Sequence, residues 1–370
     1  MTLTRVMDQT GFPFPSRLIA VYLCKEFIRL FLLCLLLFLG LSLLVDFFDR
    51  FSSFVKYKAP LSAIGSYFLF KLPLFVTQAV PAAALAGSLL SLGMLSRHKE
   101  LQALKACGVS AWQMAVPLLV SAGVLSLGGW VWNESVVPYA FHKSRYINTV
   151  EIKGKAFKGL FQTRGFWYHG ANSFYHIDHF DSRRNVLSGL TIYTLSENFQ
   201  VQFLTKIAQA SWRDGRWYFE GVQESTLERE DAYRSLPPSL LLKETPEDFS
   251  LVALKSEEFS SQALRAYIAD LQQKGLDTTE YQVDLKLKGA IPFAAFVMTL
   301  LGAALAIPGA KQLTVPTALA AALLVGFGYW VFLALTVSLG NGGILPPTLS
   351  AWLANGTLSL VGIYFLLGID

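Results

Sequence analysis

The chain has 370 residues, of which 53% are hydrophobic and 15% charged, and its mean hydropathy is +0.43. Soluble domains carry about 25% charged residues, so this composition excludes an ordinary soluble protein and favours a membrane protein. Between Pro138 and Lys288 the chain has 19 basic and 19 acidic residues, so the net charge of +5 belongs to the flanking, more apolar parts. A basic excess there points to lipid head groups and membrane orientation, not to nucleic acid.

The first third of the chain contains three apolar segments that are long enough to cross a bilayer, which takes about 20 residues. They cover roughly 27–45, 72–96 and 111–132. The first segment ends in Asp46, Asp49 and Arg50, which we expect at a water interface. Ser110 followed by Gln113 has the form of a capping box and predicts the start of the third helix.

The last third of the chain predicts three further membrane helices. One covers roughly 289–307, and after Lys311 no charged residue occurs before Asp370. That run is too long for a single helix, and the glycine-rich segment 340–343, followed by two prolines, divides it into two. The sequence therefore predicts six membrane-spanning helices.

The distribution of lysine and arginine in the short segments predicts the orientation of these helices. Cytoplasmic segments are richer in basic residues, which places the N-terminus and the link between the second and third helices inside. The basic residues on that side are Arg5, Arg17, Lys25, Arg29, Arg97, Lys99, Lys105 and Lys311. The middle of the chain then lies outside, in the periplasm of a bacterial cell with two membranes.

The middle of the chain is typical of a β-sheet, because short stretches rich in aromatic and β-branched residues follow one another. The predicted strands cover 166–169, 173–180, 189–195, 199–208 and 216–223. Asp214 and Gly215 form a strong hairpin signal, and strands without intervening helices imply an antiparallel sandwich or roll. The chain's cysteines, Cys24, Cys34 and Cys107, lie outside this region, so its fold cannot depend on disulfides.

An amphipathic helix is predicted over 260–274, where Leu264, Ile268 and Leu271 share one face and Gly275 ends the helix. The expected fold is therefore an α-helical membrane protein with an all-β domain between its third and fourth spanning helices. The expected domains are 1–137, three membrane helices; 138–258, the β domain; 259–283, the connecting helix; and 284–370, three membrane helices.

The link between the second and third membrane helices is a short polar helix over 97–108. Ser96 is expected to cap it and Gly108 to end it, and Leu101 and Leu104 form its apolar side. Its charged residues then remain available to another protein: Lys99, Glu100 and Lys105. The alternative is a turn whose charges merely face water, and the residues alone leave both interpretations open.

The run E-L-x-A-L-K-A-C-G-V-S over 100–110 resembles the coupling helix of the lipopolysaccharide-export permeases, the LptF/LptG (YjgP/YjgQ) family of ABC transporter membrane subunits. The likeness extends over nearly the whole chain, from an entry segment at 22–27 through three helices, a jellyroll-like periplasmic insert and three more helices. Segments 189–198 and 264–268, with 275–277 and Tyr281, resemble the LptG branch more than the LptF branch.

This resemblance implies that a cytoplasmic ATPase dimer (LptB-like) receives the coupling helix, with Glu100 as the charged contact. The residues expected to form or shape the contact are Glu100, Leu101, Leu104, Lys105 and Gly108. The sequence has no G-x-x-x-x-G-K-[ST] loop to hold ATP phosphates. We therefore expect a subunit that is not an enzyme and binds no cofactor, with ATP and Mg on the partner ATPase.

The resemblance also implies the remaining partners and the function. They are lipopolysaccharide, a second permease half (LptF-like), a single-helix periplasmic bridge protein (LptC-like) and a soluble bridge protein (LptA-like). The expected function is to extract lipopolysaccharide from the inner membrane and pass it to the periplasmic bridge. The alternative is a membrane-anchored assembly or sensor protein whose β domain binds a partner.

A phosphorylated glycolipid requires basic side chains at the outer head-group level. The candidates are Arg50, Lys56, Lys58, Lys71, Lys143 and Arg145, although ordinary snorkelling of interfacial residues explains them equally well. Acyl chains require an apolar groove, for which Phe174, Tyr193 and Phe203 are candidates; the alternative is that they form the domain core. His169, His176, Asp178 and His179 lie close together in the sequence. Adjacent residues of a strand point to opposite faces of the sheet, so we expect no metal site.

Overall fold

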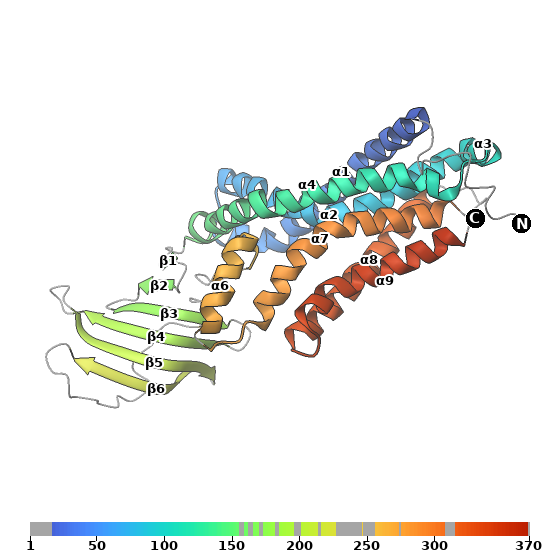
Figure 1. Cartoon of the computed structure of the whole chain (residues 1–370). Coiled ribbons are helices and arrows are strands. Elements are labelled where there is room, and N and C mark those ends of the chain that lie inside the picture. Colours follow the sequence, from blue (N-terminus) through green and yellow to red (C-terminus); the bar gives the residue numbers. More distant parts are fainter. Residues whose placement is uncertain are drawn as a thin grey trace, which may run out of the picture. The chain divides into compact units, whose positions relative to one another are not determined.

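The computed structural model describes residues 17–154, 159–161, 166–169, 173–181, 185–195, 201–213, 216–226, 246, 256–273, 275–307 and 315–368 (Figure 1). The chain divides into two compact units. The helical unit comprises Met1–Lys56, Ile64–Ser144 and Thr278–Asp370, and the sheet unit comprises Tyr57–Ala63 and Arg145–Asp277.

Within the described residues, six helices are long and apolar enough to cross a membrane, which confirms the predicted number of spans. They are α1 (Arg17–Lys56), α2 (Leu61–Arg97), α4 (Ala111–Tyr146), α7 (Thr279–Ala306), α8 (Val315–Asn341) and α9 (Pro347–Leu367). The short helix α3 (Glu100–Ala106) joins α2 to α4. Several helices exceed the predicted lengths, because hydropathy detects only the apolar part of each. At 1.5 Å per residue, the 40 residues of α1 span about 60 Å, roughly twice the hydrocarbon thickness.

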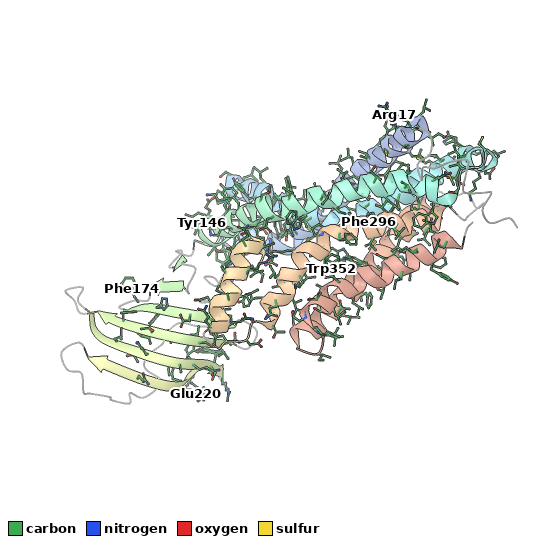
Figure 2. All side chains as sticks on the ribbon, viewed as in Figure 1. Arg17, Tyr146, Phe174, Glu220, Phe296 and Trp352 are labelled. Carbon is green, nitrogen blue, oxygen red and sulfur yellow. The ribbon has the colours of Figure 1, made fainter. Side chains whose placement is uncertain are left out.

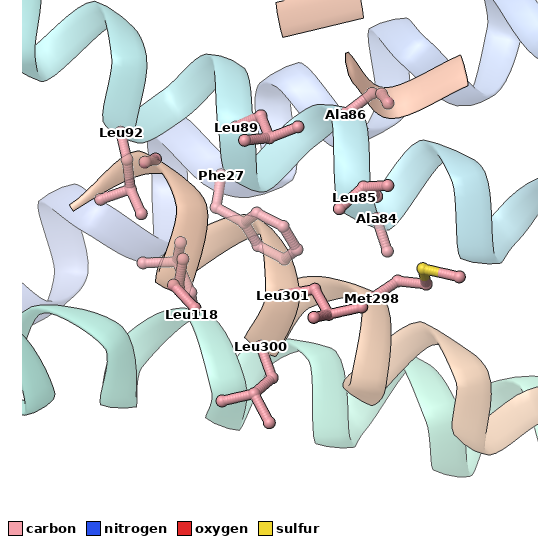
Figure 3. Close-up of a cluster of buried hydrophobic side chains, with 14 of the residues drawn as sticks. Phe27, Ala84, Leu85, Ala86, Leu89, Leu92, Leu118, Met298, Leu300 and Leu301 are labelled. Atoms are coloured by element: carbon pink, nitrogen blue, oxygen red, sulfur yellow. The ribbon is translucent and has the colours of Figure 1, made fainter. Parts of the chain in front are cut away.

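The core of the helical unit draws side chains from helices far apart in sequence (Figure 3). Phe27 of α1 is fully buried with Leu85 of α2, Leu118 of α4 and Met298 of α7. Because lipid is as apolar as these side chains, close packing between helices stabilises such a bundle more than withdrawal from water does.

Glycines allow two of these helix pairs to approach closely. A Cβ atom on Gly87 of α2 would lie 2.9 Å from the Phe31 Cα of α1, and one on Gly302 of α7 would overlap the Ser88 hydroxyl of α2. Small residues at helix contacts are the usual way to bring membrane helices together. The α1–α2 and α2–α7 contacts therefore depend on these two positions.

Helices α7 and α9 are joined by aromatic and polar contacts. The Phe293 ring of α7 lies 5.5 Å from the Trp352 ring of α9 and 5.4 Å from the Phe296 ring, and Figure 2 labels Phe296 and Trp352. The buried Asn355 Nδ2 of α9 donates to the Ala290 carbonyl of α7 at 2.7 Å. A buried hydrogen bond of this kind fixes the register of the two helices.

The sheet unit contains one six-stranded antiparallel sheet among its described residues, with the strands in sequence order. Its strands are β1 (Gly159–Phe161), β2 (Phe166–His169), β3 (Ser173–Asp181), β4 (Val186–Leu195), β5 (Val201–Arg213) and β6 (Arg216–Thr226). Arg213 pairs with Arg216, which confirms the predicted hairpin, although Asp214 and Gly215 themselves lie outside the described residues. The all-β domain between the third and fourth spanning helices is thus confirmed.

Two glycines interrupt the regular alternation of this sheet. Gly189 of β4 and Gly221 of β6 have φ values of +64° and +67°, a region that side chains disfavour. Leu187 and Leu190, on either side of Gly189, are both buried although they are three positions apart. The buried face of the strand therefore changes phase at this glycine.

Helix α6 (Ser261–Gln273) follows the sheet and has the predicted apolar face. Leu264, Ile268 and Leu271 are buried, and Gly275 follows the helix with a φ of +71°. At the other end of the sheet unit, the chain stays helical beyond position 138, where the β domain was expected to begin. Helix α4 continues to Tyr146, and a π-helical turn follows over Ile147–Ile152.

Candidate functional site

Helix α3 is shorter than the predicted polar helix, and its first turn is not capped as expected. Helix α2 continues to Arg97, so Ser96 lies inside α2 and cannot cap α3; that prediction is wrong. The residue before α3 is Lys99, which has a φ of +61° and makes no capping hydrogen bond with its side chain. Gly108, with a φ of +84°, follows the helix as predicted.

The predicted capping box at the start of α4 is confirmed. The backbone N–H of Gln113 donates to the Ser110 Oγ at 3.3 Å, and the backbone N–H of Ser110 donates to the Gln113 Oε1 at 3.1 Å. Reciprocal bonds of this kind satisfy two amides that a helix start leaves unpaired. The end of the link that joins α4 is therefore firmly defined.

The apolar side of α3 faces the helical unit as predicted. Leu101 is only 3% exposed and belongs to the bundle core, and Leu104 is partly buried against the same core. Side chains three residues apart lie on one face of a helix. These two leucines therefore anchor α3 to its own chain.

The charged residues of α3 are bound to two membrane helices. The Tyr22 hydroxyl of α1 donates to the Glu100 Oε2 at 2.9 Å. The Lys105 Nζ donates to the Ile307 carbonyl, at the C-terminal end of α7, at 3.1 Å. An ammonium group there satisfies a carbonyl that the helix end leaves unpaired. Contacts within the chain thus link both turns of α3 to spanning helices.

The surface that α3 leaves exposed contains residues beyond the predicted charged ones. Besides Lys105, the exposed residues are Lys99, just before the helix, and Gln102, Ala103 and Ala106 within it. Gln102, Ala103 and Ala106 did not figure in the sequence analysis, because the charged residues dominate the motif. A partner that reaches α3 from outside meets this surface, flanked by the partly exposed Glu100.

A second polar site connects α1 to α2. The Lys71 Nζ donates to the Asp46 Oδ1 and to the Tyr67 hydroxyl, both at 2.6 Å. The Arg50 Nε donates to the same Asp46 oxygen at 3.2 Å, and the Tyr67 hydroxyl donates to the Asp46 Oδ2 at 3.3 Å. We call these four residues the Asp46 cluster.

Burial makes the Asp46 cluster unlike an ordinary interfacial ion pair. The side chains of Lys71 and Asp46 are 11% and 15% exposed. Asp46 was expected at a water interface; its carboxylate is partly covered there by Lys71 and Tyr67 of α2. The Lys71 ammonium also lies 5.1 Å from the ring centres of Tyr67 and Phe75, within the range of cation–π attraction.

The structure brings together two of the six basic residues predicted to contact lipid, Arg50 and Lys71. Lys56 and Lys58 are exposed at and just after the end of α1. Lys143, near the end of α4, is partly buried. Arg145 forms an ion pair with Glu258, and their side chains are 14% and 3% exposed. The guanidinium of Arg145 is thus largely engaged within the sheet unit.

The residues predicted to line a groove are only partly brought together by the sheet. Phe174 of β3 pairs directly with Tyr193 of β4. Phe203 of β5 pairs with Thr194, a register position one residue out of step with that pair. The register therefore supports a Phe174–Tyr193 aromatic pair and does not extend it to Phe203.

The described residues contain no group of three His, Cys, Asp or Glu side chains placed to hold a metal ion. Within the sheet unit, the His179 Nδ1 lies 3.4 Å from the Tyr267 hydroxyl of α6.

The roles of Tyr22, Asp46 and Tyr67 in these sites were not predicted from the sequence. Tyr22 lies 78 positions before Glu100, and no local pattern links them. For Asp46 a signal exists: Asp46 and Lys71 border consecutive uncharged runs, so antiparallel helices place opposite charges at the same level. Such a pair inside a membrane protein indicates a functional site.

Comparison with known proteins gives consistent matches over most of the chain. The profile of the family described as lipopolysaccharide export system permease LptF/LptG matches residues 21–368. The chain is 25% identical over 355 residues to the lipopolysaccharide export system permease protein LptG of Escherichia coli (strain K12), covering 94% of this chain and 97% of that protein. It is 22% identical over 322 residues to LptG of Haemophilus influenzae (strain Rd), covering 84% and 87%. With six membrane-spanning helices and an antiparallel sheet between the third and fourth, the chain is a multi-pass membrane protein that belongs to the lipopolysaccharide export permease family LptF/LptG.

Proposed function

We propose that this chain is the LptG-like transmembrane subunit of an ABC transporter that extracts lipopolysaccharide from the bacterial inner membrane and passes it to a periplasmic bridge. An LptB-like ATPase dimer on the cytoplasmic side binds ATP and Mg, and this chain takes no part in the hydrolysis. An LptF-like permease half completes the lipid cavity. The lipid leaves through the periplasmic sheet unit toward LptC-like and LptA-like bridge proteins.

The geometry of α3 is the observation that carries this proposal. A short surface helix exposes one small face, buries two leucines and contacts both α1 and α7. A push on that face reaches two spanning helices directly, as coupling to an external motor requires. A link that only preserved topology would have no need of both contacts.

The lipid side of the proposal rests on Arg50 and Lys71. Their positive charges lie together on adjacent helices and suit the phosphate groups of a glycolipid. Lys56, Lys58, Lys143 and Arg145 are further candidates, and the Phe174–Tyr193 pair is a candidate contact for acyl chains. A photoreactive amino acid at Lys56, Arg145 or Phe203 should crosslink to lipopolysaccharide during ATP-driven transport.

The central test uses the complex of both permease halves with the ATPase in proteoliposomes that contain lipopolysaccharide. Glu100→Ala should uncouple ATP hydrolysis from lipid release, because it removes the charge that meets the ATPase and the Tyr22 contact. A permease that purifies stably without an ATPase and is indifferent to this substitution would instead be an assembly or sensor protein.

A matched pair of variants separates docking from general damage. Gln102→Arg places a large cation on the exposed face of α3, so we expect weaker ATPase binding and less lipid release. Gln262→Arg makes the same change on the exposed face of α6, and we expect wild-type ATPase binding. Equal behaviour of the two variants contradicts docking through α3.

The assignment of sides has a simple check, because the structure places Cys107 on the surface and buries Cys34. In intact cells, a membrane-impermeant maleimide should leave Cys107 unmodified, whereas in inside-out vesicles it should modify it. Modification from the periplasm would invert the topology and remove the basis of the export proposal.

A further inference from the structure

Two cations share one carboxylate in the Asp46 cluster. The Lys71 Nζ and the Arg50 Nε both lie within hydrogen-bond distance of the Asp46 Oδ1. The three charged side chains sum to one positive charge. Asp46 therefore only partly neutralises the cluster, and a net attraction for an anion remains.

The cluster also has a side that a ligand can approach. The Arg50 side chain is 35% exposed, whereas those of Asp46 and Lys71 are 15% and 11% exposed. The Arg50 guanidinium lies 5.0 Å from the centre of the Tyr67 ring, which orients it beside the carboxylate. An anion that reaches Arg50 is thus next to the oxygen that holds Lys71.

A phosphate group is a stronger ligand for this pair than a carboxylate. It offers more acceptor oxygens, and planar guanidinium and ammonium donors both bind it well. Asp46 is covalently fixed on α1, so it occupies the cations whenever no better anion is present. A lipid phosphate has to displace it to bind both cations.

We propose that Asp46 is an internal counter-ion that competes with the phosphate of an anionic lipid for Lys71 and Arg50, and so limits the affinity of the loaded state. This inference rests on the proposed function, since it assumes that the cluster meets the transported lipid. A moderate affinity suits a transporter, because lipid held too tightly is not passed on. Return of Asp46 to the cations favours release.

The test compares Asp46→Asn with Asp49→Asn in the complete transporter in nanodiscs. Asp49 lies one turn further along α1, is exposed, and makes no ion pair among the described residues. The probes are fluorescent diphosphorylated lipid A, its dephosphorylated form and inorganic phosphate. Asp46→Asn should tighten lipid A binding by about tenfold, as expected for removing one close competing charge. Asp49→Asn should leave it unchanged.

The other probes identify what the cluster binds. The dephosphorylated lipid should show no gain in affinity with Asp46→Asn. Tenfold tighter binding of inorganic phosphate alone, without a change for lipid A, would overturn a lipid ligand. Unchanged or weaker binding of lipid A to a folded Asp46→Asn transporter overturns the counter-ion itself, because Asp46 then only supports Lys71.

A second variant covers the case in which Asp46→Asn does not fold. Arg50→Gln leaves the buried Lys71–Asp46 pair intact and reduces the cluster to zero net charge, so lipid A binding should weaken by about tenfold. Unchanged binding overturns the inference. Failure of the proposed function is visible separately, as absence of ATP-driven lipid release by the wild-type complex, whatever the binding series shows.

Discussion

The two polar sites of the helical unit are held in different ways. Single hydrogen bonds on partly exposed side chains join α3 to α1 and α7, whereas the Asp46 cluster joins α1 to α2 through one largely buried ion pair and a shared tyrosine. An exposed hydrogen bond contributes about 0.5–1.5 kcal/mol net. Breaking a buried ion pair on one side costs about 3–5 kcal/mol.

This difference indicates what is needed to displace each site. A docking partner can displace α3 with the energy of a few contacts. The Asp46 cluster can open only if another anion takes the place of the carboxylate and Asp46 itself gains water, because an unpaired buried charge is too costly. Helix α3 is therefore suited to being displaced by a partner, and the Asp46 cluster to selecting an anionic ligand.

The largest effect is expected from Lys71→Met, which removes the buried cation and leaves Asp46 paired only with the partly exposed Arg50. We expect a loss of about 3 kcal/mol in the free energy of unfolding, at the lower end of the range for a broken buried ion pair because Arg50 remains, measured by denaturant titration in detergent. The double variant Asp46→Asn/Lys71→Met should recover part of this loss, because both buried charges are then removed and the remaining Arg50 side chain is partly exposed. A double variant as unstable as Lys71→Met would show that the pair is not a strongly coupled unit.

The next largest effect is expected at the close α1–α2 contact, where Gly87 lies against Phe31, between Tyr22 and Asp46 along α1. Gly87→Ala forces α2 away from the Phe31 backbone, so we expect destabilisation by about 1–3 kcal/mol. Gly40→Ala on α1 is the control, because an added Cβ there meets nothing within 4 Å. It should be neutral or slightly stabilising. Equal losses of thermal stability in the two variants would contradict the close α1–α2 contact.

Tyr22→Phe tests the lighter attachment of α3. It removes one hydroxyl and one hydrogen bond to Glu100, worth about 1 kcal/mol, so the lipid released per ATP hydrolysed should fall several-fold. Thermal stability should hardly change. Tyr364→Phe makes the same substitution on an exposed residue of α9 and should transport normally. If Tyr22→Phe released as much lipid per ATP hydrolysed as the wild type, the contact with α1 would not be needed for coupling.

Lys105→Met should have the smallest effect. It removes a hydrogen bond to the Ile307 carbonyl from an otherwise exposed side chain, so we expect a loss of about 0.5 kcal/mol or less in stability. The coupling ratio should fall less than in Tyr22→Phe. A larger fall, together with weaker ATPase binding, would show that Lys105 also contacts the partner.

The elements that local patterns specify were predicted well. The capping box at Ser110, the hairpin before Arg216 and the apolar face of α6 depend on neighbours in sequence, and all three are confirmed. The six spans follow from hydropathy. The extent of the helices was underestimated, because polar helical turns at Lys56 or Tyr146 carry no hydropathy signal.

The contacts that define the sites could not be predicted in the same way. The partner of Glu100 lies on α1 and the partner of Lys105 at the end of α7, which depends on how the helices pack. Gly87 permits the α1–α2 contact, but its role is visible only beside Phe31. The lipid and ATPase contacts of the individual residues stay predictions.

Helix α1 connects the two polar sites as one continuous helix. Tyr22 and Asp46 are 24 positions apart on it, about 36 Å along the axis, and its sequence contains no proline, unlike α2 and α4. A helix without proline resists kinking, so, under the proposed function, a movement of α3 can reach Asp46 through α1. ATP hydrolysis by the partner and release of the lipid would then be coupled through a single helix.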